Sequence, residues 1–147
     1  SQVERGVVTP SIPSLRALAK ALDTPVFSFF LDEDVPTRLI VRKHERGIMT
    51  VPGSGQVYEL LNPSPMQRVQ MMVLRLEPGA STGPAPQSHP GEEGVVVLRG
   101  TVTLDLRGEL YQLHEGDSAY YPSEWPHRYE NTGDAVCELL FCMTPPA

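Results

Sequence analysis

The sequence predicts a mainly β protein, an antiparallel sandwich or barrel with a small helical segment at its start. The chain of 147 residues contains 15 prolines and 12 glycines, which is typical of many tight turns. Short apolar or alternating segments lie between these turns from residue 37 onward, with no helical pattern among them. A chain of this length can form one substantial core or two small ones.

The first predicted element is a short helix within residues 1–31. Ser11 is placed to cap it, and Pro13 lies in its first turn, where a missing N–H costs little. Apolar residues follow at helical spacing: Ile12, Leu15, Leu18, Ala19 and Leu22. A helix this short is not stable alone in water, so its apolar stripe needs a partner.

An acidic stretch that ends at a proline, residues 32–36, marks the boundary to the β part. We expect residues 32–65 to hold this linker and flanking strands. The predicted strands are residues 37–42, 48–51, 56–61, 68–77, 95–98, 101–106, 109–113, 118–121 and 135–143. Arg107-Gly108 is predicted to be a two-residue hairpin turn.

The net charge of −6 argues against a bulk nucleic-acid binder, although residues 1–31 carry three basic against two acidic side chains. No apolar run approaches the ~18 residues of a membrane span, and the start lacks a signal-peptide pattern, so we expect a cytoplasmic protein. Cys137 and Cys142, five apart on one predicted strand, point to opposite faces and cannot bridge each other. We expect both to be buried free thiols.

Two stretches carry residues suited to a metal site. Residues 87–100 contain His89 and Glu93, four positions apart around a Pro-Gly bend, and residues 116–131 contribute His127. Imidazole and carboxylate groups together are a common ligand set for a divalent transition metal with open coordination positions.

These stretches resemble the two motifs of the cupin family. Gln87-x-His89-x3-Glu93-x6-Gly100 is similar to the first motif, and Gly116-x5-Pro122-x-Glu124-x2-His127-x3-Asn131 is similar to the second. The departures are Gln87, where the family usually has His, and Glu124, where it usually has Gly. The resemblance covers roughly residues 66–144 and implies a double-stranded β-helix, or jelly roll, with a cupin sensor domain over residues 66–147.

Carried over residue by residue, the resemblance implies metal ligands at Gln87, His89, Glu93 and His127, with zinc, iron, manganese or nickel as suitable ions. Because Gln87 offers only a neutral amide oxygen, we expect weaker metal retention than from a full His set. The alternative is a metal-free polar pocket in which the histidines hydrogen-bond a ligand or Glu93.

Strand parity and family position also nominate a pocket wall, although core packing explains such residues about as well. The wall residues are Met72, Leu74, Tyr120, Trp125 and Phe141. Arg75 and Arg99 are candidates to pair with an anionic ligand, but each is more often a surface charge. We expect His44, His114 and Glu92 to be exposed to solvent.

Residues 1–31 resemble the C-terminal half of an XRE-type (lambda-repressor-like) helix-turn-helix domain. The string is Ser1-Gln2-Val3-Glu4-Arg5-Gly6 … Pro10-Ser11 … Leu15 … Leu18-Ala19-x-Ala21-Leu22 … Phe30. The resemblance places Ser1, Gln2 and Arg5 at the end of the recognition helix, as a DNA-binding remnant. Base contacts come mostly from the start of such a helix, which in the family precedes this segment. We therefore expect the chain as given not to read a DNA sequence, although its intact parent should; a helical hairpin covering a β edge is the alternative.

Together the two resemblances imply a DNA-binding transcriptional regulator whose cupin domain binds a small-molecule effector with a metal. Such regulators generally form homodimers to match two DNA half-sites. The resemblances favour a regulator over an enzyme and leave enzymatic activity open. The alternatives are a mononuclear metal-dependent oxygenase or epoxidase of the same layout, with a triad of His89, Glu93 and His127, and a metal-free binding or dimerisation module.

Overall fold

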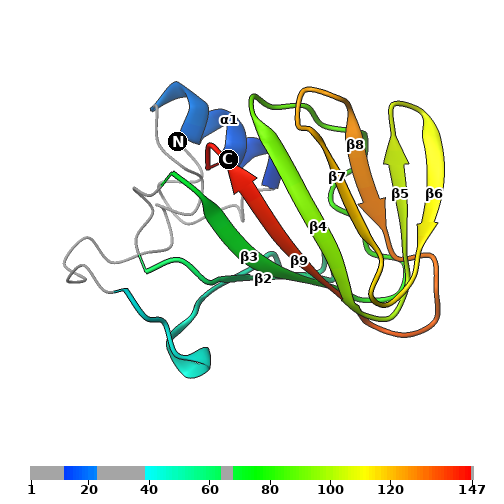
Figure 1. Ribbon diagram of the computed structural model, residues 1–147, viewed down its shortest axis with the longest axis horizontal. Helices are drawn as coiled ribbons and strands as arrows, with labels where there is room; N and C mark the ends of the chain where they lie inside the picture. Colours follow the sequence, from blue (N-terminus) through cyan, green and yellow to red (C-terminus); the bar gives the residue numbers. More distant parts are fainter. Residues whose placement is uncertain (1–11, 23–38, 64–67, 147) are drawn as a thin grey trace.

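The computed structural model describes residues 12–22, 39–63 and 68–146 (Figure 1). The predicted cap Ser11 and the remnant residues Ser1, Gln2 and Arg5 lie outside the described residues, as does the whole predicted acidic boundary, residues 32–36.

Two antiparallel sheets form the body of the molecule (Figure 1). The larger sheet has the strand order β1-β2-β3-β9-β4-β7, and the smaller has the order β6-β5-β8. The strands are β1 (Gly47–Thr50), β2 (Gln56–Leu60), β3 (Gln70–Leu76), β4 (Glu92–Arg99), β5 (Val102–Leu106), β6 (Glu109–Leu113), β7 (Ser118–Pro122), β8 (His127–Glu130) and β9 (Cys137–Thr144). This order, in which β9 lies between β3 and β4, confirms the mainly β jelly roll.

The core lies between the inward faces of the two sheets. Val97 on β4, Leu104 on β5 and Leu139 on β9 are almost completely buried there. Their neighbours along each strand are more exposed, because successive side chains of a strand point to opposite faces. Burial of these apolar faces therefore fixes which side of each strand the chain presents to the interior.

One strand prediction was wrong, and one strand was missed. Of the predicted strand 37–42 the structure describes residues 39–42, which form no strand and pair with none of the described strands. Leu39 and Ile40 are 90% and 60% exposed, and a short 3-10 helix, η2 (Lys43–Glu45), follows them. Strand β8 was not predicted, because its four residues, His-Arg-Tyr-Glu, show no apolar alternation. It nevertheless pairs with β5 along its whole length.

Helix α1 (Ile12–Ala21) packs against the barrel. Leu15 and Ala19 are 6% and 3% exposed and belong to the same apolar cluster as the barrel core, whereas Leu18 and Leu22 face solvent. The partner of the predicted stripe is thus the barrel itself. In the view of Figure 1, α1 lies behind the end of the chain. Within the described residues, no helix is long and apolar enough to cross a membrane.

Cys137 and Cys142 are free and point to opposite faces of β9. Cys137 is buried in the core as predicted. The expectation of burial was wrong for Cys142, which lies on the outer face of the large sheet and is exposed.

Candidate metal centre and ligand pocket

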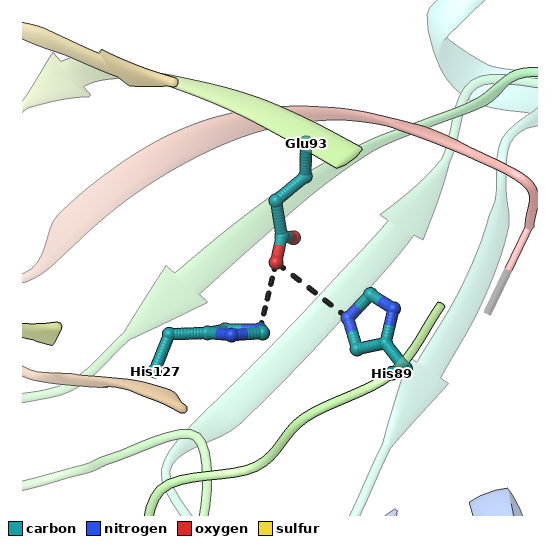
Figure 2. Close-up of side chains that lie close together, drawn as sticks. All are labelled: His89, Glu93 and His127. Atoms are coloured by element: carbon teal, nitrogen blue, oxygen red, sulfur yellow. Dashed lines mark ion pairs between the residues drawn. The ribbon is translucent and has the colours of Figure 1, made fainter. Parts of the chain in front are cut away.

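Three side chains from different parts of the fold meet between the two sheets (Figure 2). His89 lies in the segment before β4, Glu93 is on β4 of the large sheet, and His127 begins β8 of the small sheet. One ligand atom from each residue lies within 4.8 Å of the others. The structure therefore brings together the two imidazoles and the carboxylate of the predicted set.

Backbone hydrogen bonds hold the segment before β4 against the small sheet. The amides and carbonyls of Gln87 and His127 exchange hydrogen bonds of 2.9 and 3.0 Å, and the His89 amide donates to the Ser123 carbonyl at 3.0 Å. Gln87 thus lies directly opposite His127 and lines the same pocket.

The hydrogen bonds of both rings fix which nitrogen faces the centre. Nδ1 of His127 lies 2.7 Å from the Trp125 carbonyl oxygen, and Nδ1 of His89 lies 3.3 Å from that of Pro90. Because a carbonyl oxygen only accepts, Nδ1 carries the proton in each neutral ring. Nε2 of each neutral ring is then a lone pair, and both Nε2 atoms point toward Glu93.

The two Nε2 atoms approach the same carboxylate oxygen, Oε1 of Glu93, at 2.7 Å from His127 and 3.5 Å from His89 (Figure 2). With neutral imidazoles this buried oxygen has no hydrogen-bond donor among the described residues. The arrangement needs either extra protons on the rings or a cation between the three atoms. Its donor set, with Nδ1–H of each ring tied to a carbonyl, suits a divalent transition metal.

Glu93 is anionic at neutral pH. Burial by itself raises the pKa of this carboxyl, but hydrogen bonds and charge from His127 and His89 together outweigh it and lower the pKa to about 2. The side chain is 2% exposed, so its charge is compensated by the imidazoles or by an ion bound with them rather than by water.

Two tyrosines support this centre and were not predicted. The Tyr121 and Tyr129 hydroxyls lie 2.6 Å apart, and the Tyr121 ring is 5.1 Å from that of His127. Burial raises the pKa of Tyr121 far above its usual range, and Tyr129 and Glu93 raise it further, so its hydroxyl keeps its proton. Tyr121 lies directly opposite Glu93 in the pairing of β4 with β7. Only knowledge of this pairing would have placed Tyr121 at the centre.

A small pocket that is partly open to solvent lies beside the centre. Three of the predicted wall residues, Met72, Leu74 and Phe141, line it together with Glu93 and His127. Polar groups from Thr82, Tyr129 and Arg16 also line it. The pocket therefore combines an apolar wall with several polar side chains that could orient a bound molecule.

Tyr120 and Trp125, the other two residues of the predicted wall, do not line this pocket. Tyr120 is 68% exposed because Tyr121, its neighbour on β7, takes the inward position. Trp125 is 38% exposed, and the Arg107 guanidinium lies 4.6 Å from the centre of its ring. Only the Trp125 backbone reaches the site, through the carbonyl that accepts from His127.

The remaining candidates lie away from the centre. His44, His114 and Glu92 are exposed, as predicted. Arg75 pairs with Glu59, which also accepts from Arg46 at 2.8 Å, and Arg99 is exposed on the surface. Neither of the arginines considered as anion partners therefore lines the pocket.

Comparisons with known proteins agree with this architecture. The family model described as "Cupin domain" matches residues 72–143. The HTH-type transcriptional regulator PuuR of Escherichia coli is 28% identical over 146 residues, which cover 99% of this chain and 78% of that protein.

Two solved structures share the fold. An HTH_3 family transcriptional regulator from Vibrio cholerae superposes over 99% of this chain and 78% of its own, with a TM-score of 0.75 and 20% identity. The Cupin_2 domain of an XRE family transcriptional regulator from Enterobacter cloacae covers 63% of this chain and 99% of its own, with a TM-score of 0.56 and 22% identity. Residues 72–143 of this chain are a domain of the cupin family, and along almost its whole length the chain is similar to a helix-turn-helix transcriptional regulator.

Proposed function

We propose that this chain is part of a DNA-binding transcriptional regulator whose cupin domain binds a small-molecule effector with the help of a divalent transition metal. The observation that carries the regulator is the 28% identity to an HTH-type regulator along 99% of the chain, which includes residues 1–31 as well as the barrel. A likeness confined to the barrel would fit many unrelated functions, because fold alone does not specify function.

His89, Glu93 and His127 would hold the metal. The supporting geometry is the pair of Nε2 lone pairs aimed at Glu93 Oε1, with each Nδ1–H tied to a backbone carbonyl. A bound ion would offer its open positions to an oxygen or nitrogen atom of the effector. Gln87, which lines the same pocket, is the candidate for a further neutral oxygen ligand.

The proposed regulator is a homodimer, in which two DNA-binding domains match two half-sites. Support comes from the outer face of the large sheet, where exposed apolar side chains lie side by side on neighbouring strands. Met71 on β3 lies opposite the exposed Cys142 on β9, and Tyr120 on β7 continues the same row across Gly94. A second copy of the chain would cover this apolar row.

Metal content tests the proposed ligand set. We expect purified protein to carry a divalent transition metal and His127→Ala to lose it, because the variant removes one of three ligands and leaves two. His114→Ala is the matched control, since His114 is exposed and outside the cluster. Elemental analysis per chain is the measurement. Equal metal in His127→Ala and the wild type would contradict the ligand set.

DNA binding tests the regulator itself. The full-length gene product, including whatever precedes Ser1, is used to select sequences from a random duplex library, and the selected sequence is then titrated at moderate salt. We expect enrichment of a two-fold symmetric site, because a dimer presents two recognition helices. A library that shows no enriched sequence would overturn the proposal.

A mononuclear oxygenase is the second candidate, because two imidazoles and one carboxylate without Gln87 are the ligand set of non-haem iron oxygenases. Oxygen consumption by the iron(II)-loaded protein with a panel of small organic acids separates the two functions. Sustained uptake that depends on substrate and is lost in Glu93→Gln would favour the enzyme.

A further inference from the structure

We propose that Arg16 of helix α1 is the anion-binding residue of the effector pocket, and that the effector is a small molecule bearing a carboxylate or another compact anion. This inference rests on the proposed function, because it assumes that the barrel binds an effector. It adds the chemical class of that effector and links the pocket to the helical segment.

The helix places Arg16 at the pocket. Leu15 and Ala19, the residues at 6% and 3% exposure on α1, pack into the barrel core on the same side of the helix. Arg16, which directly follows Leu15, lines the pocket that also contains Glu93 and His127. An arginine anchored by two buried neighbours is held in place before any ligand arrives, which lowers the entropic cost of binding.

One donor of this arginine lacks a partner. Its Nε–H is buried and has no hydrogen-bond acceptor among the described residues. The other buried or half-buried arginines have carboxylates at hand, since Arg46 and Arg75 pair with Glu59 and Arg128 pairs with Glu130. A guanidinium with an unused donor beside a pocket matches a carboxylate or phosphate oxygen in geometry as well as in charge.

The charges around the pocket favour an anion. Glu93 already has His89 and His127 against its Oε1 atom, so Glu93 is not available to Arg16 as a simple partner. The other polar lining groups are neutral at physiological pH, among them Thr82, Gln87 and Tyr58. Burial raises the pKa of Tyr58 to about 12 while the nearby Arg16 charge opposes that rise, so this tyrosine supplies no negative charge.

The position of Arg16 gives the anion a second role. Arg16 belongs to residues 1–31, which resemble part of a DNA-binding domain, whereas Glu93 and His127 belong to the barrel. A ligand held by both would stabilise the arrangement in which α1 is seated on the barrel. Such differential binding to one arrangement is what an effector needs to shift a regulator between two states.

The test is isothermal titration of the 147-residue chain with straight-chain dicarboxylates from malonate to adipate, and with the corresponding neutral diamides. We expect at least one diacid to bind, and its diamide to bind at least tenfold more weakly, because the guanidinium recognises charge. Arg16→Ala should weaken the diacid at least tenfold. Arg16→Lys should lose less, because lysine keeps the charge but not the planar fork.

Lys20→Ala is the matched control, because Lys20 lies one turn further along α1, is exposed and carries the same charge. Its affinity for the diacid should stay within twofold of the wild type. Circular dichroism of each variant shows whether α1 and the barrel remain folded. Equal affinity in Arg16→Ala, equal binding of diamide and diacid, or no binding of any diacid by the wild type would each overturn the inference.

Failure here is distinguishable from failure of the regulator. Metal content and DNA selection do not involve Arg16, so a protein that keeps both but binds no anion would refute only the assignment of Arg16. A protein that binds a diacid through Arg16 but selects no DNA would instead refute the proposed function.

Discussion

Glu93 illustrates how a single buried carboxylate is kept charged. Water is excluded from it, and its partners are two imidazoles whose opposite ring nitrogens are already committed to backbone carbonyls. The hydrogen bonds that orient the rings therefore also decide what Glu93 faces, which is the Nε2 atom of each ring. A cation bound between these three atoms would satisfy all of them at once.

This arrangement predicts an acid-sensitive contribution to stability in protein stripped of metal. The pKa of Glu93 falls from 4.5 to about 2 on folding, so the unfolded chain binds this proton first as the pH drops. The stabilisation is complete above pH 4.5 and is lost as the pH falls toward 2. One pKa unit corresponds to about 1.4 kcal/mol, so roughly 3 kcal/mol of unfolding free energy is at stake.

Urea unfolding in the presence of a chelator, at a series of pH values between 5 and about 2, measures this loss. In Glu93→Gln the pH dependence should be shallower than in the wild type by that amount. Glu92→Gln, which removes the exposed neighbouring carboxylate, should leave the wild-type slope in place. Identical slopes in Glu93→Gln and the wild type would show that Glu93 has no special coupling to folding.

Motif spacing made part of the site predictable from the sequence, whereas strand register and helix docking were not predictable. His89, Glu93 and His127 stand at recognisable spacings, and the structure brings them together. Tyr120 and Tyr121 are adjacent and chemically alike, so only the register of β7 on β4 decides which one enters the core. Arg16 gave no signal at all, because its place at the pocket depends on how α1 docks on the barrel.

At the scale of elements, the turn before β4 determines where the His89 segment runs. Gly91 has a φ of +105°, and a Cβ atom there would overlap the carbonyl oxygen of Thr144 at the end of β9. The amide of Ser123 donates to the Gly91 carbonyl at 2.8 Å, which ties the same turn to the loop after β7. Glycine is thus required both for backbone conformation and for space.

Gly91→Ala should therefore destabilise the fold by more than about 2 kcal/mol. The positive φ alone costs an alanine about 1–2 kcal/mol, and the clash with the Thr144 backbone adds to that cost. Gly53→Ala is the matched control, because Gly53 has a φ of +78° but nothing within 4 Å of an added Cβ. It should show the strain alone. Chemical denaturation of the two variants gives the difference, and equal losses would mean that the β9 end yields to the new methyl group.

Whether a strand was predicted correctly from the sequence depended on its pattern of apolar residues. Strands such as β3 and β9 are long and rich in apolar residues, so the sequence indicated them with only their ends shifted. Strand β8 was not predicted because its two inward-facing residues are His127 and Tyr129, whose polar atoms form hydrogen bonds at the site. Strand β8, which contributes His127 to the candidate site, is therefore the strand whose sequence departs from the apolar pattern of a buried strand.

For the molecule as a whole, the outer face of the large sheet predicts the oligomeric state. Met71 is 40% exposed within the apolar row that runs to Cys142 and Tyr120. We expect the wild type to be a dimer through this face and Met71→Glu to shift it toward monomer, because burying an unpaired charge costs several kcal/mol, on the order of a hundredfold in affinity or more.

Light scattering after size-exclusion chromatography measures the mass. Leu110→Glu serves as the control, since Leu110 is 71% exposed but lies on β6 of the small sheet. Its mass should equal that of the wild type. A dimer that survives Met71→Glu but dissociates in Leu110→Glu would move the interface to the small sheet.

The contact between the Trp125 carbonyl and His127 has a practical consequence, because Trp125 is the only tryptophan in the chain. The indole stands two positions from a candidate ligand and shares its loop, yet its ring remains outside the cavity beneath the Arg107 guanidinium. Its emission is therefore an intrinsic optical probe: a paramagnetic ion arriving at the histidines would quench it without any dye or label.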